Sequence, residues 1–445
     1  MDKYNFKTKP YDHQLEALTE SCDRKQYALF MEMGCGKSKV IIDNFVHLYS
    51  QGKLNNILIV APKGVYSTWV NKELQTHIPD DIELDIVKWS SSHTKKLLKE
   101  LDSLFKYDNK LKILVMNIEA FSTKKGCQYA NKFIQANKTM FVIDESTTIK
   151  NPSAKRTINC VRLGKYAHYR RILTGSPITK SPLDLYSQCM FLDPGLLGFS
   201  SYYAFRARYA DMKEMTGQGR TFKFVTGYKN LDELNETLGK FSHRVLKKDC
   251  LDLPEKIYIR REIQMTSEQT KAYKELQNFA ATQLANNKLV TINHIMTQII
   301  RLHQISCGFI GTDDGSITEL TNNRVSELSS ILEETDGKVI IWANYRHDIK
   351  RIEKLLIDTY GEESVGTYYG DVKQERREFV INEFQNPTSP MRFFVGNTQT
   401  GGYGITLTAA STVIYFSNNY DLEKRLQSED RAHRIGQTNK VTYID

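Results

Sequence analysis

A run of glycine, lysine and serine near the N-terminus has the residue types that can hold a polyphosphate. It reads Met33-Gly34-Cys35-Gly36-Lys37-Ser38 and follows a short apolar stretch. Glycine tolerates the backbone angles that turn consecutive N–H groups toward one anion. In such loops the lysine contacts the β- and γ-phosphates and the hydroxyl binds Mg²⁺. The helix predicted from Lys39 would direct its positive end at the same phosphates.

This loop alone does not establish the chemistry, because its match to the general pattern is incomplete. Met31 stands where Gly-x-x-x-x-Gly-Lys-Ser/Thr has its first glycine, so a plain turn entering a helix is an alternative. Support comes from Asp144 and Glu145, which end an apolar run. Asp144 can hold Mg²⁺ opposite Ser38, and Glu145 can orient or deprotonate an attacking water. An acidic pair can also simply begin a turn, but beside the loop it makes ATP hydrolysis the leading hypothesis.

Two arginines near the C-terminus complete the set of candidate residues. Arg431 and Arg434 are three positions apart, so they share one face if this stretch is helical. Arginine can neutralise the charge that builds on a γ-phosphate during its transfer. From the residue pattern alone, a charged surface helix that pairs with Glu429 and Asp430 is the better-supported alternative.

Apolar runs alternate with predicted helices in the first part of the chain. The runs lie at 27–31, 56–61, 82–89, 112–117, 139–144 and 170–174. Such alternation predicts a doubly wound parallel sheet, in which ligands bind beyond the carboxyl ends of the strands. Asp144 and Glu145 end one run, and Thr174-Gly175-Ser176 follow another. We therefore expect both groups at the same edge of the sheet.

The pattern changes twice further along the chain. From about 181 to 323 it is mostly helical, with a hairpin or ordered loop predicted at 217–227, and strand–helix alternation resumes at Lys338. We predict an ATP-binding lobe at 1–192, a mostly helical insertion at 193–323 and a second α/β lobe at 324–445. A chain of 445 residues is long enough for two or three domains with full cores.

Composition narrows the class of protein. The net charge is +9, from 61 basic and 52 acidic residues, which permits a polyanionic partner but does not require one. The seven cysteines form no Cys-x-x-Cys pair, which argues against a zinc site or a disulfide framework and favours a reducing cytosol. We see no apolar run near the roughly 20 residues of a membrane span, and no signal peptide. We expect a soluble intracellular protein without a membrane partner.

The central stretch carries basic and aromatic residues whose role the sequence leaves open. The basic residues are Arg206, Arg208, Arg244, Lys247, Lys248, Arg260 and Arg261. A solvated helical surface and an arm that faces nucleic acid explain them equally well. The aromatic residues Tyr202, Tyr203, Phe222 and Phe224 could stack on bases, but a place in the core is the favoured interpretation.

Several motifs, in order along the chain, resemble the ATPase motor of the Swi/Snf-type branch of helicase superfamily two. The matching stretches are Gln14, 33–38, Val-Ala-Pro at 60–62, Asp-Glu-Ser-Thr-Thr-Ile-Lys-Asn at 144–151, Leu-Thr-Gly-Ser-Pro at 173–177, 243–254, 398–410 and Gln-Ser-Glu-Asp-Arg-Ala-His-Arg-Ile-Gly-Gln at 427–437. The last is the most specific. In this branch the loop has a Met-Gly-x-Gly-Lys core, so the missing first glycine is expected.

The resemblance implies two RecA-like lobes that hold ATP and Mg²⁺ in the cleft between them and duplex DNA across the top. It assigns catalysis to Lys37, Asp144, Glu145, Arg431 and Arg434, the two arginines reaching across from the second lobe. It assigns nucleotide contacts to Gln14, to 33–38, to Gly404 and to Gln427, with Gln14 on adenine, and metal contacts to Ser38 and Asp144. Thr174, Gly175 and Ser176 would couple ATP state to DNA grip. DNA phosphate contacts would fall on Lys63, Thr398, Thr400, Gly401 and Gly402.

Three features depart from the family pattern. Ser146 and Thr147 stand where Ala-His usually follows the acidic pair, which puts the histidine-mediated link between hydrolysis and DNA in doubt. Gln399 replaces a common basic residue before the paired glycines and could weaken one phosphate contact. The chain also stops at Asp445, soon after the arginine segment, where family motors usually continue.

These features lead us to expect a DNA-stimulated ATPase that moves along double-stranded DNA with little sequence preference. The alternatives are a helicase that separates strands and a non-catalytic DNA-binding scaffold gated by nucleotide; an RNA-directed motor is less favoured. We expect a monomer in the cytoplasm, in a bacterial or virus-infected cell more than in a nucleus. Protein partners and the biological pathway cannot be inferred from the sequence.

Overall fold

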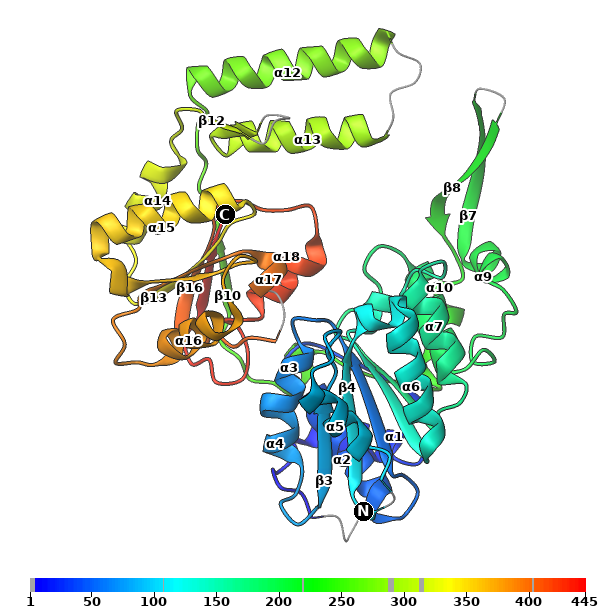
Figure 1. The fold of residues 1–445 in the computed structure, drawn as a ribbon. Helices are drawn as coiled ribbons and strands as arrows, with labels where there is room; N and C mark the ends of the chain where they lie inside the picture. Colours follow the sequence, from blue (N-terminus) through cyan, green and yellow to red (C-terminus); the bar gives the residue numbers. More distant parts are fainter. Residues whose placement is uncertain (1–4, 107, 218–219, 287–291, 312–315, 402–403) are drawn as a thin grey trace. The chain divides into compact units, whose positions relative to one another are not determined.

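The computed structural model describes residues 5–106, 108–217, 220–286, 292–311, 316–401 and 404–445. This part of the chain forms two compact units, Met1–Asp252 and Leu253–Asp445, named unit 1 and unit 2 below. Each unit has its own parallel sheet with helices packed against it (Figure 1). The prediction of two doubly wound parallel-sheet lobes is confirmed.

The described residues of unit 1 form a seven-stranded sheet in the order β3-β4-β2-β5-β6-β1-β9, and every neighbouring pair is parallel. The strands are β1 Gln26–Met31, β2 Asn56–Ala61, β3 Leu84–Lys88, β4 Leu111–Asn117, β5 Thr139–Asp144, β6 Tyr169–Leu173 and β9 Ser242–Val245. The apolar runs of the sequence therefore mark six of these strands to within two residues. Only β9, a short edge strand, was not predicted.

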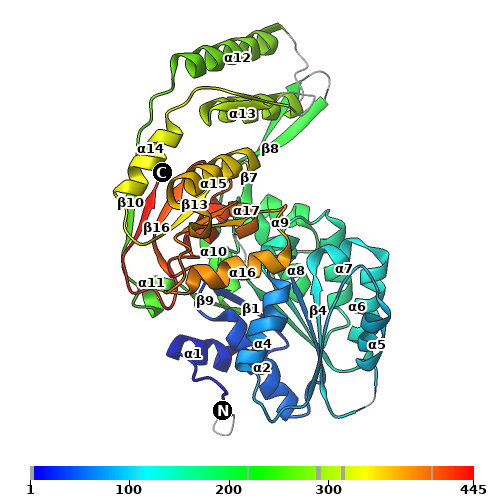
Figure 2. The same cartoon turned by 60° about the vertical axis from the view of Figure 1, so that its left-hand side comes forward.

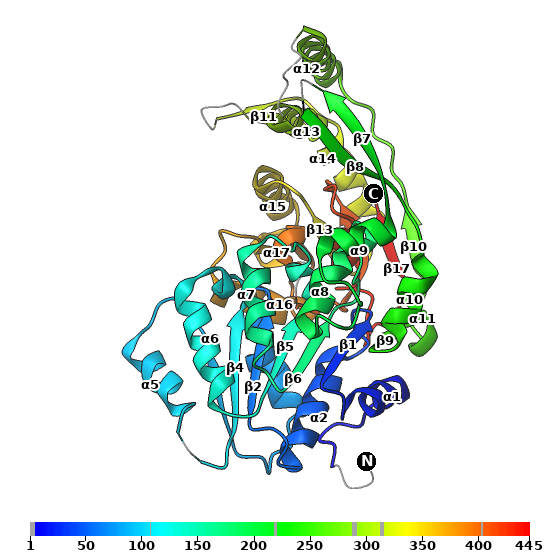
Figure 3. The same cartoon turned by 90° about the vertical axis from the view of Figure 1, so that its right-hand side faces the viewer.

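Both faces of this sheet are covered because its strands are apolar on both sides. Along β1, Ala28 and Phe30 belong to one buried cluster, whereas Leu29 and Met31 belong to another. Successive residues of a strand point to opposite faces, so the two clusters are the cores above and below the sheet. The helices are α1 Asp12–Ser21, α2 Lys37–Ser50, α3 Tyr66–Thr68, α4 Leu74–His77, α5 Lys95–Ser103, α6 Lys124–Ala136, α7 Lys155–Gly164, α8 Leu185–Leu192, α9 Tyr202–Tyr209, α10 Leu231–Gly239 and α11 Lys247–Cys250. Figure 3 shows α2 and α6 on opposite sides of the sheet.

A long antiparallel hairpin extends from unit 1 next to α9 (Figure 1). Its strands are β7 Ala210–Gly217 and β8 Arg220–Tyr228. The sequence predicted a hairpin at 217–227, so only its second strand was placed correctly. Gly217 ends the first strand instead of beginning the hairpin.

The described residues of unit 2 repeat the architecture on a six-stranded sheet in the order β10-β17-β16-β13-β15-β14. Figure 2 shows this sheet with helices beside it. The strands are β10 Lys256–Ile259, β13 Lys338–Trp342, β14 Val365–Tyr368, β15 Phe393–Gly396, β16 Ala410–Tyr415 and β17 Val441–Ile444, with a small pair β11 Phe309–Gly311 and β12 Ile317–Glu319. The helices are α12 Ser267–Asn286, α13 Ile292–Ser306, α14 Arg324–Glu333, α15 Arg346–Tyr360, α16 Gln374–Gln385, α17 Thr398–Gly401 and α18 Leu422–Glu429. Ile341 and Ile340 of β13 again lie in separate cores.

The chain leaves unit 1 at Asp252 and enters unit 2 at Leu253. This point lies inside the stretch 193–323, which the sequence predicts as a separate insertion. Residues before it are compact with the first sheet and residues after it with the second. The three-part division stays a prediction.

Among the described helices, none combines the length and the apolar character that crossing a membrane requires.

Arg171 connects α1 to the middle of the unit 1 sheet. Its side chain lies in β6 with no exposed surface, and burial lowers its pKa to about 10. It donates hydrogen bonds of 2.6–3.2 Å to Asn44 Oδ1 and to the carbonyl oxygens of Ser21, Arg24, Lys25 and Arg170. Three of these carbonyls, those of Ser21, Arg24 and Lys25, lie at the end of α1 or in the turn that follows it. Arg171 thereby fixes α1, the helix that carries Gln14.

Replacing Arg171 by methionine should destabilise unit 1 by about 1–3 kcal/mol, because Asn44 and several carbonyls lose a buried hydrogen-bond donor at once. Hydrogen-exchange mass spectrometry of peptides from β1 and β6, in increasing urea, would measure the change. Arg162→Met on the exposed side of α7 is the matched control and should change the exchange much less. Equal stability of the two variants would contradict the role given to Arg171.

Candidate functional site

The glycine loop follows β1 and leads directly into α2. Gly34 and Gly36 have φ values of 85° and 84°, the left-handed region in which glycine is favoured. Lys37 is the first residue of α2, and its Nζ donates to the carbonyl oxygen of Met31 at 2.7 Å. The lysine is therefore buried inside the curve of the loop, with Ser38 partly exposed beside it.

Gln14 packs directly on this loop. Its Nε2 donates to the carbonyl oxygen of Cys35 at 3.2 Å, and the Nε2 of His13 hydrogen-bonds to the same oxygen at 2.9 Å. A Cβ atom at Gly36 would lie 2.1 Å from Gln14 Nε2. Position 36 therefore requires glycine for two reasons, its positive φ and the space that Gln14 takes.

Cys35, at the centre of the loop, carries no charge at neutral pH. It is fully buried, and its Sγ lies 3.8 Å from the Sγ of Cys250. Burial and the neighbouring Cys250 raise the pKa of the Cys35 thiol to about 12. The loop thus contains no thiolate that would repel a phosphate.

Asp144 and Glu145 lie at the carboxyl end of β5, as the sequence predicted. Asp144 Oδ2 accepts a hydrogen bond of 2.9 Å from Trp69 Nε1, and Oδ1 accepts one of 3.0 Å from the backbone N–H of Glu145. Burial raises the pKa of Asp144, while the bond from Trp69 and the charge of Lys37 act in the opposite direction. Glu145 has a φ of 48°, an uncommon conformation for a residue with a side chain. The Asp144 carboxylate is thus held by two hydrogen bonds, and Glu145 begins the turn that follows β5.

The turn at Thr174-Gly175-Ser176 lies between the acidic pair and the loop, because β6 pairs with β5 on one side and β1 on the other. A Cβ at Gly175 would come within 3.2 Å of the Met33 nitrogen and 3.3 Å of Glu32 Cα. The structure thus brings the turn into close contact with the loop backbone. A role in coupling ATP state to DNA grip remains a prediction.

A buried amide joins this turn to the acidic pair. Ser146 Oγ donates to Gln188 Oε1 at 2.6 Å, and Gln188 Nε2 donates to the carbonyl oxygen of Pro177 at 2.8 Å. Ser146 and Gln188 have no exposed surface. Ser146, which departs from the family pattern, therefore has a hydrogen-bonded connection to the 174–177 turn.

In unit 2, the two arginines converge on one backbone oxygen. Arg431 Nη1 donates to the carbonyl oxygen of Ile405 at 3.1 Å, and Arg434 Nη1 donates to the same oxygen at 3.2 Å. Arg431 is only 5% exposed, and its Nε also donates to the carbonyl oxygen of Gln427 at 2.9 Å. The structure thus brings the arginines together beside Gly404, which has a φ of 70°.

The residues predicted to contact DNA differ in how exposed they are. Lys63 is exposed just after β2. Thr398 is buried, and its hydroxyl accepts a hydrogen bond of 3.1 Å from Asn419 Nδ2. Gly401 lies against the Trp342 ring, which a Cβ would approach to 2.4 Å. Thr400 is partly exposed next to it, whereas Gly402 lies outside the described residues. Their contact with DNA remains a prediction.

The basic residues of the central stretch belong to two different units. They divide between the units at 252, and several form ion pairs within their own unit. Arg208 pairs with Glu233, and Arg261 pairs with Glu334. These ion pairs are typical of a solvated surface, and an arm that faces nucleic acid stays a prediction.

The aromatic residues of that stretch separate into two groups. Tyr202 packs against Tyr186, with ring centroids 5.5 Å apart, so the core interpretation is confirmed for it. It was wrong for Tyr203 and Phe224, which are 71% and 41% exposed. The side chain of Phe222 lies outside the described residues.

Trp69 and Gln188 belong to the site but were not predicted. Trp69 reaches Asp144 from a short helical segment far away in the sequence, and no spacing rule connects the two residues. Gln188 did have a signal, because it is an amide inside the apolar helix Leu185–Leu192. A buried polar side chain needs partners, so an amide in such a helix indicates a buried network.

Two protein families match the chain. The SNF2-related domain matches residues 13–308, and the helicase conserved C-terminal domain matches residues 323–436. The mouse protein "Chromodomain-helicase-DNA-binding protein 1-like" is 25% identical over 429 residues, which cover 93% of this chain and 44% of that protein. The "Putative ATP-dependent helicase/translocase YwqA" of Bacillus subtilis is 27% identical over 421 residues, which cover 91% of this chain and 42% of that protein. The chain thus spans less than half the length of these relatives.

Among solved structures, the "Sulfolobus solfataricus SWI2/SNF2 ATPase core in complex with dsDNA" is 25% identical and has a TM-score of 0.48. The alignment covers all of this chain and 89% of that one. A TM-score below 0.5 establishes no shared arrangement, so the assignment depends on the two family matches. The first includes the glycine loop and the acidic pair, and the second includes both arginines. The chain belongs to the SNF2-related family and carries the helicase conserved C-terminal domain after the SNF2-related domain.

Proposed function

We propose that this protein hydrolyses ATP and uses the energy to move along double-stranded DNA. One observation carries the proposal: unit 1 brings Lys37, Asp144 and Glu145 to the same edge of one sheet, with Gly175 packed between them. This edge is where parallel sheets bind their ligands. The family assignment supports the same activity.

The residues present fit ATP with Mg²⁺. Gly34 and Gly36 hold the loop open toward an anion, and Lys37 would exchange its bond to Met31 for phosphate oxygens. Ser38 and Asp144 would hold Mg²⁺, which commonly takes one or two protein ligands beside phosphates and water. When bound, Mg²⁺ supplies positive charge to the β- and γ-phosphates. Because burial raises the pKa of Asp144, a cation beside it would favour the ionised carboxylate.

In this proposal Glu145 orients the attacking water and accepts its proton. Arg431 and Arg434 would neutralise the charge that develops on the γ-phosphate, for which a guanidinium is well suited. Because unit 1 supplies the lysine and the carboxylates while unit 2 supplies the arginines, we expect neither unit alone to hydrolyse ATP well.

DNA is the proposed partner because the mouse relative is named a helicase and DNA-binding protein and the Bacillus subtilis relative a helicase/translocase. That the DNA is double-stranded follows from the motif resemblance and belongs to the proposal. Contacts from Lys63, Thr400 and backbone amides would go to phosphates. Phosphate contacts carry little sequence information and weaken with salt. We therefore propose binding with little sequence preference. A monomeric state and a cytoplasmic location stay predictions.

Strand separation is the second candidate function, and one observation favours it. Tyr203 is 71% exposed, and the guanidinium of Arg206 lies 5.2 Å from the centroid of its ring. Phe224 is exposed on the hairpin that extends nearby. Aromatic side chains with arginine can stack on unpaired bases.

The experiment that tests the proposal measures ATP turnover with duplex DNA, single-stranded DNA and RNA in parallel. Strand-separation and triplex-displacement assays on the same substrates distinguish the two candidates. Displacement of a third strand without separation of the duplex supports translocation, whereas separation of the duplex supports the second candidate. Turnover that no nucleic acid alters would contradict both.

Glu145→Gln should retain ATP binding but lose turnover by about a hundredfold or more, because the amide cannot accept the proton of water. Steady-state turnover and binding of a fluorescent ATP analogue measure the two effects separately. Glu16→Gln on the exposed side of α1 makes the same chemical change away from the site and should behave like the unchanged protein. Normal turnover of Glu145→Gln would mean that another group acts as the base.

Ser146→Ala should lower the stimulation of turnover by DNA severalfold while basal turnover changes less. The change removes the 2.6 Å bond to Gln188 and leaves a buried acceptor without its donor. The ratio of turnover with and without saturating duplex DNA measures the effect. Ser153→Ala, at an exposed position after the same motif, is the control. An unchanged ratio in Ser146→Ala would show that this bond does not contribute to coupling.

A further inference from the structure

Residues 254–258, named the strap here, lie at the start of unit 2 and contact the segment that carries the arginines. The carbonyl oxygen of Pro254 hydrogen-bonds to His433 Nε2 at 2.7 Å. Glu255 pairs with Lys440 at 2.9 Å. The rest of the strap begins β10, which pairs with β17 over four residues. The strap therefore contacts the stretch 429–440 at His433 and at Lys440.

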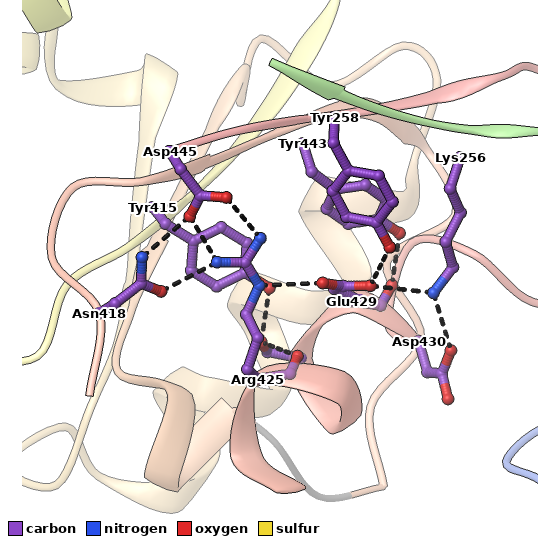
Figure 4. A network of polar contacts seen from close by, with 10 residues as sticks. Lys256, Tyr258, Tyr415, Asn418, Arg425, Glu429, Asp430, Tyr443 and Asp445 are labelled. Atoms are coloured by element: carbon purple, nitrogen blue, oxygen red, sulfur yellow. Dashed lines mark hydrogen bonds and ion pairs between the residues drawn. The ribbon is translucent and has the colours of Figure 1, made fainter. Parts of the chain in front are cut away.

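Glu429 is the centre of these contacts (Figure 4). Its Oε2 accepts hydrogen bonds from Lys256 Nζ at 3.0 Å and from the hydroxyl of Tyr258 at 2.8 Å, and its Oε1 accepts one from Arg425 Nε at 2.9 Å. The carboxylate is only 3% exposed. A buried carboxylate is tolerated only when it is paired and hydrogen-bonded, so the strap is required to keep Glu429 in place.

The backbone of Glu429 begins the turn that leads to Arg431 and Arg434. Glu429 is the last residue of α18, and its carbonyl oxygen accepts the backbone N–H of Ala432 and of His433, both at 3.2 Å. The same oxygen accepts a hydrogen bond of 2.9 Å from the hydroxyl of Tyr443. Arg431 therefore lies within a turn that begins at Glu429, whose carboxylate the strap binds, and Arg434 directly follows this turn.

The strap is the end of a chain segment that starts at 245 in unit 1. The start of this segment contacts Glu32, the residue just before the glycine loop. The N–H of Glu32, just before the loop, donates to the carbonyl oxygen of Val245 at 2.9 Å. The Oε2 of Glu32 accepts a hydrogen bond of 2.7 Å from the N–H of Lys247. The chain thus runs from a contact with the phosphate loop at 245–247 to a contact with the arginine segment at 254–258.

We propose that this connection is a coupling element in which Glu429 is a positioning residue for Arg431 and Arg434. A change in the glycine loop would act through Glu32 on the start of the connection, and through the strap on Glu429. The inference depends on the proposed ATPase function, because it assigns the arginines a part in turnover. It adds a route by which the phosphate loop and the arginines affect each other through the covalent chain.

The test uses the full chain with Glu429→Gln, which keeps the shape of the side chain and removes its charge. We expect kcat for ATP to fall by roughly tenfold or more, because a small displacement of a catalytic group is costly, while KM for ATP stays within about twofold. Hydrogen-exchange mass spectrometry should show lost protection at 430–434 and unchanged protection in β13 and β16. Tyr258→Phe removes one bond to the same carboxylate and should show a smaller change in the same direction.

Glu255→Gln is the matched control. It makes the same chemical change on the strap itself, but the pair of Glu255 with Lys440 is exposed, with side-chain exposures of 77% and 61%. Exposed pairs contribute little, so kcat and exchange should match those of the unchanged protein. Equal effects of Glu429→Gln and Glu255→Gln would overturn the proposal. So would lost protection throughout the unit 2 sheet, because the effect would then be general destabilisation.

The exchange experiment also separates this inference from the proposed function. If the unchanged protein hydrolyses no ATP, the proposed function fails. The positioning role then stands or falls with local protection at 430–434 in Glu429→Gln. If the protein hydrolyses ATP and that protection is unchanged, only the positioning role fails.

Discussion

The parallel pairing of β6 with both β1 and β5 is the interaction on which the site in unit 1 depends. Leu173 lies opposite Leu29 of β1 on one side and opposite Asp144 of β5 on the other. Strands that are parallel and in this register end at the same edge. The glycine loop, the 174–176 turn and the acidic pair are therefore brought together by backbone hydrogen bonds before any of their side chains interact. A shift of one residue would also reverse which side chains face each core.

The sequence predicted this edge because its evidence is local. An apolar run indicates a buried strand, and the polar residues that follow it must lie at the strand's end. Arg171 and Gln188 were not predicted because their importance comes from partners far away in the chain. Arg171 meets Ser21 across 150 positions, and Gln188 meets Ser146 across 42. Periodicity and motif spacing contain no information about such pairs.

The departures from the family pattern show the same limit. Ser146 was identified as unusual, but its meaning depends on Gln188, a residue that only the folded chain brings beside it.

The hairpin was misplaced for a related reason. Glycines at 217 and 219 indicate a turn, but they do not say which strands the turn connects. That depends on the pairing of β7 with β8, which extends from Ala210 opposite Tyr228 to Gly217 opposite Arg220.

Gln14 donates a hydrogen bond to the glycine loop, at the carbonyl oxygen of Cys35, and its side chain occupies the space in front of Gly36. If Gln14 contacts the base as proposed, the base subsite and the phosphate subsite are thermodynamically linked. Linkage is reciprocal, so whatever free energy the base adds to phosphate binding, the phosphates must add to base binding. Selectivity for adenine would then depend on the number of phosphates and would be greatest for the triphosphate. The binding free energies of the base and of the phosphates would then not be additive.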